Sequence, residues 1–334
     1  MMQNKQSKTS LPTRVDDFRE GLTTLELSEW ISSHREALEA KLLAHGALLF
    51  RGARIASAED FGSVVTAMTP ELLSYTGGGS PRSKVSGRIY TSTEYVGTVH
   101  IPLHCEMSYT PSIPGRIWFF CQKKSQAGGS TPLGYLADIG ANLPIEITHR
   151  FQEKGVRYTA FMHHGAGFGK SWQKTYETDD KDEVSALLEA EEGLEYEWKK
   201  DGLFVSRTHP SHRRHSVTEE VLWYNQAVNW HPAHLGLANF ERLGKVFGRP
   251  ENFPKMAFFG DGSPIPPEDI LKIDEVSRHC EHNFDWEEGD VVVVDNERVA
   301  HGRQAFEGER CVLVAMAMAK ASFQTKITSD DEQC

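Results

Sequence analysis

The order of apolar and polar positions changes along the chain. In the first seventy residues the spacing is helical: apolar side chains recur every three or four positions over residues 25–43 and 57–68. Ser57 provides a cap for the second of these segments. Between them, residues 46–50 form a short apolar run that is typical of a buried strand. The chain therefore begins with a helix, a strand and a second helix.

Strand patterns dominate from residue 89 onward. We expect strands over 116–121, 291–294 and 311–318, a hairpin over 194–206 with its turn at 200–202, helices over 142–152 and 181–190, and loops or turns at 76–82 and 128–132. No internal repeat or dividing linker interrupts this order. We predict a mainly β fold with helical insertions, a β-sandwich or jelly roll, forming one domain over 15–322 between polar tails at 1–14 and 323–334.

Composition narrows the class of protein. The 334 residues are 39% hydrophobic and 25% charged, and the formal net charge of −11 argues against nucleic acid or an anionic membrane as a partner. The five cysteines include no C-x-x-C pair, which argues against a disulfide framework or a zinc ribbon. No apolar run reaches the ~18 residues of a membrane helix, and the N-terminus has no secretory pattern. We expect a cytoplasmic protein, and the composition does not indicate its oligomeric state.

Two histidines and a carboxylate form a candidate metal site. His104 and Glu106 are two positions apart, so on an extended segment their side chains leave the same face. His301 follows the predicted strand 291–294 and the turn at Asp295 and Asn296. Two imidazoles and one carboxylate leave positions open on a metal, as non-haem Fe(II) requires, whereas structural zinc prefers four filled positions.

A guanidinium and a hydroxyl complete the pattern. Arg310 opens the apolar strand at 311–318, where its planar fork can grip a carboxylate through paired charge-assisted hydrogen bonds. Thr131, at the end of the Gly128-Gly129 turn, can offer its hydroxyl to the same carboxylate. Arg303 is a rival for this anchor.

These motifs, taken in order, resemble those of a known family. An H-x-E at 104–106, a G-G-x-T-P at 128–132, a D-N-x-x-x-x-H-G-R at 295–303 and a G-x-R at 308–310 resemble the taurine dioxygenase (TauD/TfdA) family, in particular its clavaminate synthase-like branch. The resemblance implies a double-stranded β-helix, Fe(II) as cofactor, and 2-oxoglutarate and O2 as co-substrates. It implies metal ligands at His104, Glu106 and His301, and 2-oxoglutarate contacts at Thr131 and Arg310.

The resemblance also suggests the kind of substrate. That branch oxidises amino acids or related small molecules, free or tethered to a carrier protein, in natural product biosynthesis. Hydroxylation is the default outcome, and desaturation or cyclisation remains open. The candidate substrate contacts are Arg88, Glu94, Ser108 and Asn225. Arg82 is a further candidate, although an arginine in such a loop is more often solvated.

Three alternatives remain open from the sequence. The substrate can be another small acid, such as a sulfonate. A metal-dependent hydrolase or isomerase can use the same three ligands, although it has no need of Arg310. A cupin-like binding protein without turnover is the third, and it leaves costly buried polar groups without a use.

Overall fold

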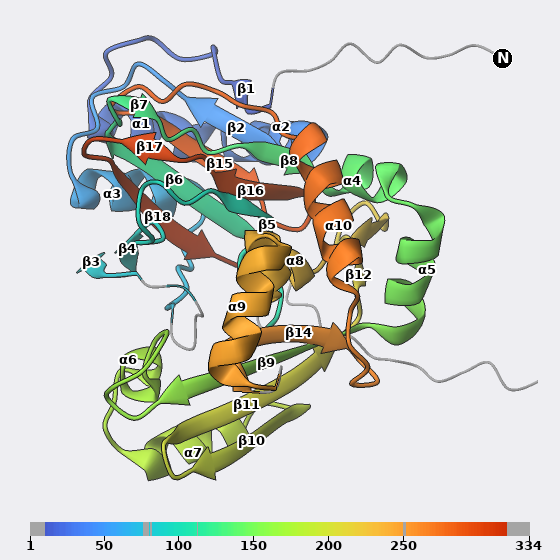
Figure 1. Ribbon diagram of the computed structural model, residues 1–334. Coiled ribbons are helices and arrows are strands. Elements are labelled where there is room, and N and C mark those ends of the chain that lie inside the picture. The colour runs from blue at the N-terminus through green and yellow to red at the C-terminus, as the bar shows by residue number, and fades with distance from the viewer. Residues whose placement is uncertain (1–10, 76–79, 81, 112, 250–251, 319–334) are drawn as a thin grey trace, which may run out of the picture.

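The computed structural model describes residues 11–75, 80, 82–111, 113–249 and 252–318 (Figure 1). Its largest sheet has seven strands in the order β1-β2-β15-β6-β18-β4-β3. The strands are β1 (Thr13–Arg14), β2 (Ala47–Phe50), β15 (Val291–Asp295), β6 (Arg116–Lys123), β18 (Cys311–Ala317), β4 (Ile89–Thr91) and β3 (Lys84–Ser86). Only the β1–β2 pair is parallel. Strands from both ends of the chain therefore lie side by side.

Alternate residues of this sheet pack on opposite faces, because successive side chains of a strand point to opposite sides. In β6, Trp118 and Phe120 belong to the core beneath α1 (Thr24–Ser33), α2 (Arg35–His45) and α3 (Ala58–Met68). Ile117 and Phe119 belong to the core on the other face, together with Leu133 and Val299 of a second sheet. The central strands are buried on both faces, and the sheet is one layer of a sandwich.

The second sheet carries part of the site. It has three strands in the order β5-β16-β8, namely β5 (Ile101–His104), β16 (Val299–Arg303) and β8 (Leu133–Tyr135). All its pairs are antiparallel, and His301 of β16 is in register with His104 of β5 and with Leu133 of β8. Two short ribbons, β17 (Phe306–Glu307) with β7 (Ala127–Gly128) and β12 (His212–Arg214) with β13 (Val221–Trp223), complete this part.

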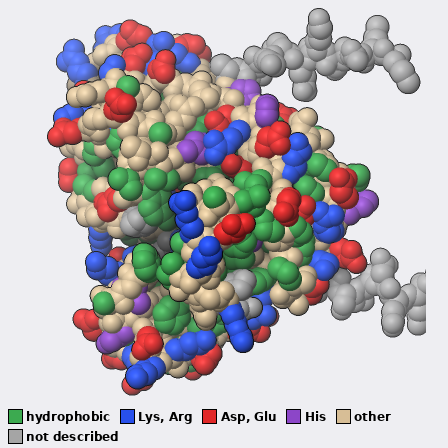
Figure 2. All heavy atoms as spheres, viewed as in Figure 1, with side chains coloured by type: hydrophobic (Ala, Val, Ile, Leu, Met, Phe, Trp, Pro, Cys, Tyr) green, Lys and Arg blue, Asp and Glu red, His purple; other side chains and the backbone are tan. Residues whose placement is uncertain are grey.

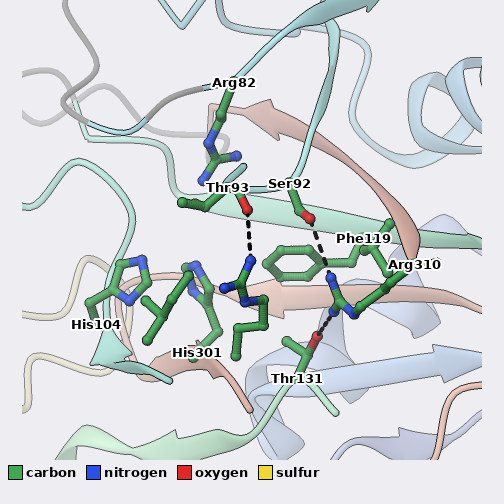
Figure 3. Close-up of a pocket in the computed structure, with 12 residues that line it drawn as sticks. Arg82, Ser92, Thr93, His104, Phe119, Thr131, His301 and Arg310 are labelled. Atoms are coloured by element: carbon green, nitrogen blue, oxygen red, sulfur yellow. Dashed lines mark hydrogen bonds between the residues drawn. The ribbon is translucent and has the colours of Figure 1, made fainter. Parts of the chain in front are cut away.

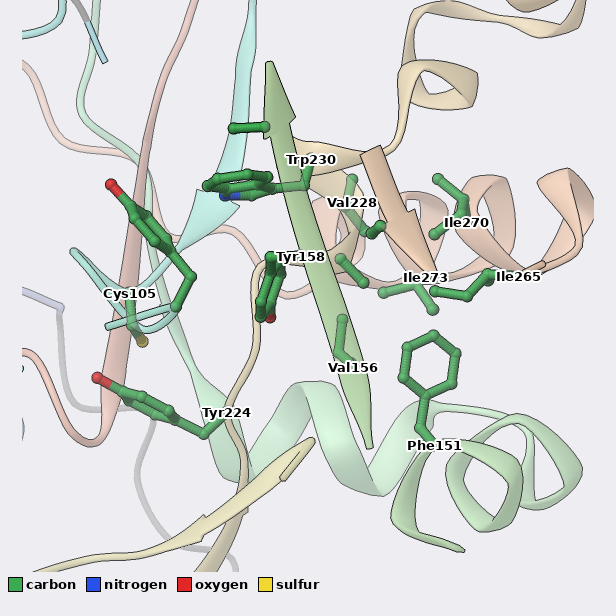
Figure 4. Packing of buried hydrophobic residues seen from close by; sticks show 14 of the residues in the cluster. Cys105, Phe151, Val156, Tyr158, Tyr224, Val228, Trp230, Ile265, Ile270 and Ile273 are labelled. Carbon is green, nitrogen blue, oxygen red and sulfur yellow. The ribbon is translucent and has the colours of Figure 1, made fainter. Parts of the chain in front are cut away.

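A third sheet forms the lower part of the molecule in Figure 1. Its order is β10-β11-β9-β14, with β10 (Leu194–Lys199), β11 (Gly202–His209), β9 (Val156–His163) and β14 (Lys255–Phe259). The helices associated with it and with the link to the sandwich are α4 (Leu136–Asn142), α5 (Ile145–Lys154), α6 (Trp172–Tyr176), α7 (Lys181–Glu189), α8 (Ala227–Trp230), α9 (Leu237–Phe247) and α10 (Pro267–His279). Tyr158 of β9 packs against Trp230 of α8 in the shared core (Figure 4).

Most predicted elements are present, and two differ in detail. The segment 25–43 is two helices, because the backbone leaves the helical conformation at His34 (φ −107°, ψ 15°). The helix predicted to begin at residue 142 begins at Ile145, after Pro144. The hairpin forms as expected, with Lys199 facing Gly202 across a two-residue turn. At the second helix, Ser57 and Asp60 form a reciprocal capping box.

The predicted tails lie mostly outside the described residues. Within the predicted N-terminal tail, however, Leu11 is buried and Thr13–Arg14 pair with β2. The folded part therefore starts a few residues earlier than the sequence pattern indicates. Within the described ranges, none of the helices is both long and apolar enough to span a bilayer. On the face shown in Figure 2, acidic and basic side chains are intermingled rather than gathered by sign.

Candidate metal centre and its two cavities

Three side chains converge between β5 and β16. One ligand atom from each of His104, Glu106 and His301 lies within 4.8 Å of the other two, in an arrangement that can hold a metal ion. The two imidazole rings are 4.4 Å apart between centroids, and Nε2 of His301 is 3.7 Å from Oε2 of Glu106. The pairing of β5 with β16 brings the histidines together, and Glu106 follows two residues after β5 ends.

Backbone contacts fix this group in place. Nδ1 of His104 lies 2.9 Å from the carbonyl oxygen of Pro102, so this nitrogen carries the proton and Nε2 keeps its lone pair. The amide of Asn296 accepts from the Glu106 N–H (2.8 Å) and donates to the carbonyls of Glu106 (3.0 Å) and Pro114 (2.8 Å). The sequence suggested that Asn296 shapes a turn. Asn296 lies in the turn between β15 and β16, as expected, and its side chain also positions the segment that carries the carboxylate.

The protonation states suit metal binding. Burial and the neighbouring His301 lower the pKa of His104 to about 3, and burial lowers the pKa of His301. Burial alone would raise the pKa of Glu106, but the charge of Arg82 and the two histidines lower it to about 2. At neutral pH the site therefore offers two neutral imidazoles and one ionised carboxylate, as a divalent metal requires.

Arg82 is also part of the site, although the sequence favoured a solvated loop position for it. Its side chain is 2% exposed, and Nη2 donates to Oε2 of Glu106 at 2.5 Å. The guanidinium carbon also lies 4.7 Å from the centre of the Tyr75 ring. Its Nε and Nη1 atoms are buried without a hydrogen-bond partner among the described residues. The expectation of a solvated loop arginine is wrong at this position.

A narrow cavity extends from the two histidines toward Arg310 (Figure 3). Arg310 donates through Nε to the Gly129 carbonyl (2.9 Å) and through Nη2 to the Thr131 hydroxyl (3.2 Å), while Nη1 reaches the Ser92 hydroxyl (3.4 Å). The described residues place no carboxylate in an ion pair with it, and burial lowers its pKa to about 10. The guanidinium is thus prepared for an anion that enters the cavity.

The turn before Thr131 allows this approach. Gly129 has φ +74°, and a Cβ atom there would lie 3.1 Å from Cδ of Arg310 and 2.4 Å from the hydroxyl of Ser125. Only glycine therefore fits where the turn passes the guanidinium. Thr131 also accepts a hydrogen bond from Nε1 of Trp286 (3.1 Å), which holds its hydroxyl in position.

Arg303 lines the same cavity, but both of its terminal nitrogens already donate to backbone carbonyls. Nη1 donates to the carbonyls of Thr93 and Tyr95, each at 3.0 Å. Nη2 donates to the carbonyls of Val96 (2.9 Å) and Val99 (3.0 Å). Four backbone carbonyls leave Arg303 little capacity for a ligand carboxylate. Its role is to hold the segment 93–99 against β16.

A wider cavity lies on the other side of the three side chains. It is bordered by His104 and Glu106 and continues into an outer cleft, with which it shares Tyr109, Trp230 and Lys255. Among the described residues, Glu106 is the only acidic one in the lining of the inner cavity, and the outer cleft has none. The basic residues of the outer lining are Lys170, Lys174, Arg207 and Lys255. This cleft leads from the protein surface to the metal centre.

The four predicted substrate contacts lie in neither cavity lining. Arg88 is exposed and donates to the Leu72 carbonyl, and Glu94 is exposed and accepts from Thr91. Asn225 donates to the Ser211 carbonyl. Ser108 is buried with its hydroxyl unpartnered among the described residues.

The sequence neighbours of two predicted substrate contacts border the inner cavity instead. Gln226 lies in its lining next to Asn225, and Tyr109 next to Ser108. Both are one position away in sequence, where a small change of backbone direction decides which side chain faces inward. The amide of Gln226 donates to the Cys105 carbonyl at 2.5 Å, so a backbone contact holds it at the cavity wall.

Two imidazoles and a carboxylate, bordered by a cavity that ends in an arginine without an anion, are typical of mononuclear non-haem iron oxygenases. A family model described as "Taurine catabolism dioxygenase TauD, TfdA family" matches residues 11–316. The chain belongs to this family. It is a non-haem iron dioxygenase that depends on Fe(II) and 2-oxoglutarate.

Two relatives in sequence agree with this assignment. The chain is 33% identical over 291 residues to the dapdiamide synthesis protein DdaC of Enterobacter agglomerans, covering 87% of each chain. It is 30% identical over 302 residues to a clavaminate synthase-like protein of Arabidopsis thaliana, covering 86% of each. A solved taurine dioxygenase from Burkholderia xenovorans is 15% identical with a TM-score of 0.49, and the match covers 85% of this chain and 80% of that one.

Proposed function

We propose that this oxygenase hydroxylates an amino acid or an amino-acid-derived small molecule in the biosynthesis of a specialised metabolite. The observation that carries the proposal is the pairing of the His104, Glu106 and His301 group with Arg310 at opposite ends of one cavity. The relatives are named for dapdiamide synthesis and as clavaminate synthase-like, which favours biosynthesis over taurine catabolism. Desaturation and cyclisation need the same protein groups and remain outcomes of the product analysis.

We assign the three converging side chains as iron ligands, and Arg310 with Thr131 as the anchor for the distal carboxylate of 2-oxoglutarate. The donor set fits the metal, because its nitrogens are neutral, its carboxylate is ionised, Glu106 and His301 are buried and His104 is half-buried. When bound, iron supplies the oxidising chemistry with O2 and 2-oxoglutarate. The chain's own residues orient the co-substrate, exclude water and keep the ligands unprotonated. The two sheets that enclose this site are proposed to be a double-stranded β-helix.

The inner cavity is proposed as the substrate site. Tyr109, Gln226 and Trp230 border it, so both aromatic surface and an amide can contact the substrate. A pocket that hydrogen-bonds polar groups rejects analogues that leave those groups unpaired. Because the outer cleft adjoins the inner cavity, a carrier-tethered substrate stays possible as well as a free one.

The ligand assignment is tested by His104→Ala and His301→Ala. Each variant is expected to lose iron and turnover, because two remaining donors hold a labile divalent ion poorly. Iron content after anaerobic reconstitution and succinate formation are the measurements. His279→Ala, an exposed histidine at the end of α10, is the control and is expected to keep both. Full iron occupancy in either ligand variant would refute the assignment.

The substrate class is tested by succinate formation with free amino acids, their carrier thioesters, taurine and aryloxyacetates. Stimulation by amino acids or thioesters is the expected result, and the thioesters alone would identify a carrier protein as partner. Stimulation confined to taurine or aryloxyacetates would contradict the proposal.

A further inference from the structure

Arg82 has more donors than partners. Nη2 donates to Glu106 and the guanidinium lies over the Tyr75 ring, while Nε and Nη1 are buried without a geometrically well-formed hydrogen bond among the described residues. A guanidinium presents five N–H groups in a planar fork, and leaving buried donors unmade is costly. Because the side chain is 2% exposed, water at the surface cannot satisfy them. A further acceptor that reached these donors would stabilise the guanidinium.

A metal ion held by Glu106 would compete with Arg82 for the carboxylate. The Glu106 oxygen that accepts from Arg82 is also the one nearest to Nε2 of His301. A cation held by Glu106 and His301 would therefore share this carboxylate with Arg82. When Glu106 ligates a cation, its negative charge is shared with that cation. The salt bridge to Arg82 is correspondingly weakened.

The charges at the loaded centre do not balance without a further anion. With both histidines neutral, Fe(II) and Glu106 together carry one positive charge, and Arg82 and Arg310 add two more. Dianionic 2-oxoglutarate neutralises two of these three. One positive charge remains buried next to the metal, where an unpaired charge is expensive. Arg303 is not counted, since four carbonyls solvate it.

We propose that Arg82 binds a carboxylate of the substrate beside the metal, so that the substrate is an acid oxidised close to its carboxyl group. This inference rests on the proposed function and narrows its substrate class. A planar carboxylate matches the guanidinium fork through two parallel hydrogen bonds. Arg82 lines the narrow cavity beside His104 and His301, and Glu106, to which it donates, borders the inner cavity, so the guanidinium lies where the two cavities meet. The outer cleft and the inner cavity have basic side chains in their linings and, among the described residues, no acidic one other than Glu106, which favours an anionic substrate.

The first test needs no substrate. Thermal unfolding of the wild type and Arg82→Gln is measured in the metal-free state and with Mn(II) and 2-oxoglutarate. In the metal-free state Arg82→Gln is expected to lower Tm, because it leaves Glu106 buried without its partner. In the loaded state the same change removes an unpaired charge. The rise in Tm on loading is therefore expected to be larger in Arg82→Gln than in the wild type.

The opposite result would overturn the proposal. A smaller rise in Arg82→Gln means that Arg82 supports the metal ligand or the co-substrate rather than awaiting a further anion. Arg54→Gln removes an exposed arginine at a distance from both cavities, and its rise is expected to equal that of the wild type.

The second test uses matched pairs of probes, namely N-acyl amino acids and dipeptides as free acids and as C-terminal amides. In the wild type, the free acid is expected to stimulate succinate formation with kcat/KM at least about 30-fold above that of its amide. In Arg82→Gln this preference is expected to fall to within about threefold. Arg82→Lys, which keeps the charge but not the fork, is expected to fall between the two.

The co-substrate is monitored in the same variants. The absorption band of the anaerobic Fe(II)–2-oxoglutarate complex gives the Kd of 2-oxoglutarate, which is expected to stay within about threefold in Arg82→Gln. Equal use of acid and amide by the wild type contradicts the inference while leaving the oxygenase function intact. A more than tenfold loss of 2-oxoglutarate affinity in Arg82→Gln would reassign Arg82 to the co-substrate. Loss of the band in the wild type would instead refute the proposed function itself.

Discussion

Arg310 shows how one side chain can be positioned by several neighbours and still lack a counter-ion. Gly129, Thr131 and Ser92 each contact it, yet all three offer neutral oxygens. Neutral acceptors orient a guanidinium without neutralising it. This combination favours reversible binding of an anion over a permanent ion pair.

Arg310→Gln is therefore expected to weaken 2-oxoglutarate far more than iron. Removing one partner of a buried charged pair costs about 3–5 kcal/mol, which is roughly two to more than three decades in Kd. Titration of the co-substrate against the Fe(II) absorption band, without O2, measures this. An unchanged titration curve would place the anchor elsewhere.

Asn296→Ala is expected to destabilise the protein although Asn296 touches no ligand atom. The change leaves the Glu106 N–H without its side-chain acceptor and two carbonyls without their donor, at a cost of at least about 2 kcal/mol. Urea unfolding measures the loss, and iron affinity should fall with it because Glu106 is less well positioned. Asn239→Ala, whose amide caps an exposed carbonyl, is the matched control. Equal losses in the two variants would exclude a special role for Asn296.

Among the secondary-structure elements, the C-terminal end of α2 packs against the strand that carries His301. Gly46 terminates α2 with φ +72° and leads directly into β2. A Cβ atom at this position would lie 2.5 Å from Cγ2 of Val299, two residues before His301 on β16. The connection between α2 and β2 therefore packs against the strand that carries a proposed ligand.

Gly46→Ala is expected to destabilise the fold by more than Gly21→Ala. Both glycines have positive φ, but nothing lies within 4 Å of a Cβ atom at Gly21. Gly21→Ala therefore measures the free-energy cost of the backbone conformation alone, about 1 kcal/mol. In Gly46→Ala the clash with Val299 is expected to add about 1–3 kcal/mol. Free energies of unfolding in urea provide the comparison. Equal destabilisation of the two variants would mean that β16 shifts at Val299 to accommodate the added Cβ atom without a cost in free energy.

The sequence predicted elements better than it predicted side-chain directions. Strands such as β6 and β15 were evident because continuous β-branched and aromatic runs are specific to buried strands. His104, Glu106 and His301 were identified through ordered motifs. Asn225 was chosen where Gln226 lines the cavity, since short irregular segments have no period that fixes which side chain faces inward.

Arg82 illustrates the same difficulty more strongly. Its neighbours in sequence, rich in glycine, serine and proline, are typical of a solvated loop. Its burial arises from contacts with Tyr75 and Glu106, and the second of these is distant in sequence. No local pattern encodes a contact of that kind.

For the molecule as a whole, buried histidines determine how stability responds to acid. Burial, with His234 nearby, lowers the pKa of His231 to about 4, below the usual 6.5 or so of an unfolded histidine. The unfolded chain therefore takes up a proton at a pH where the folded chain does not. Its contribution to stability is complete above pH 7 and is lost as the pH falls toward 4.

His231→Gln is expected to reduce the acid sensitivity of the metal-free protein. Between pH 7 and pH 5 the wild type should lose about 2 kcal/mol through this one group. Urea unfolding at both pH values, compared with the exposed control His279→Gln, measures the difference. A variant that loses as much stability as the wild type would show that His231 does not contribute.

The pairing of β5 with β16 determines when, during synthesis and folding, the proposed metal site can form. The proposed ligands come from two strands that are neighbours in space but lie at residues 101–104 and 299–303. A ribosome must therefore synthesise the chain as far as residue 301 before both histidines exist, and long-range strand pairing forms slowly. Nascent or truncated chains expose the H-x-E segment without a site for iron. If the proposed ligands hold iron, metal binding would therefore distinguish chains in which β5 and β16 have paired from chains in which they have not.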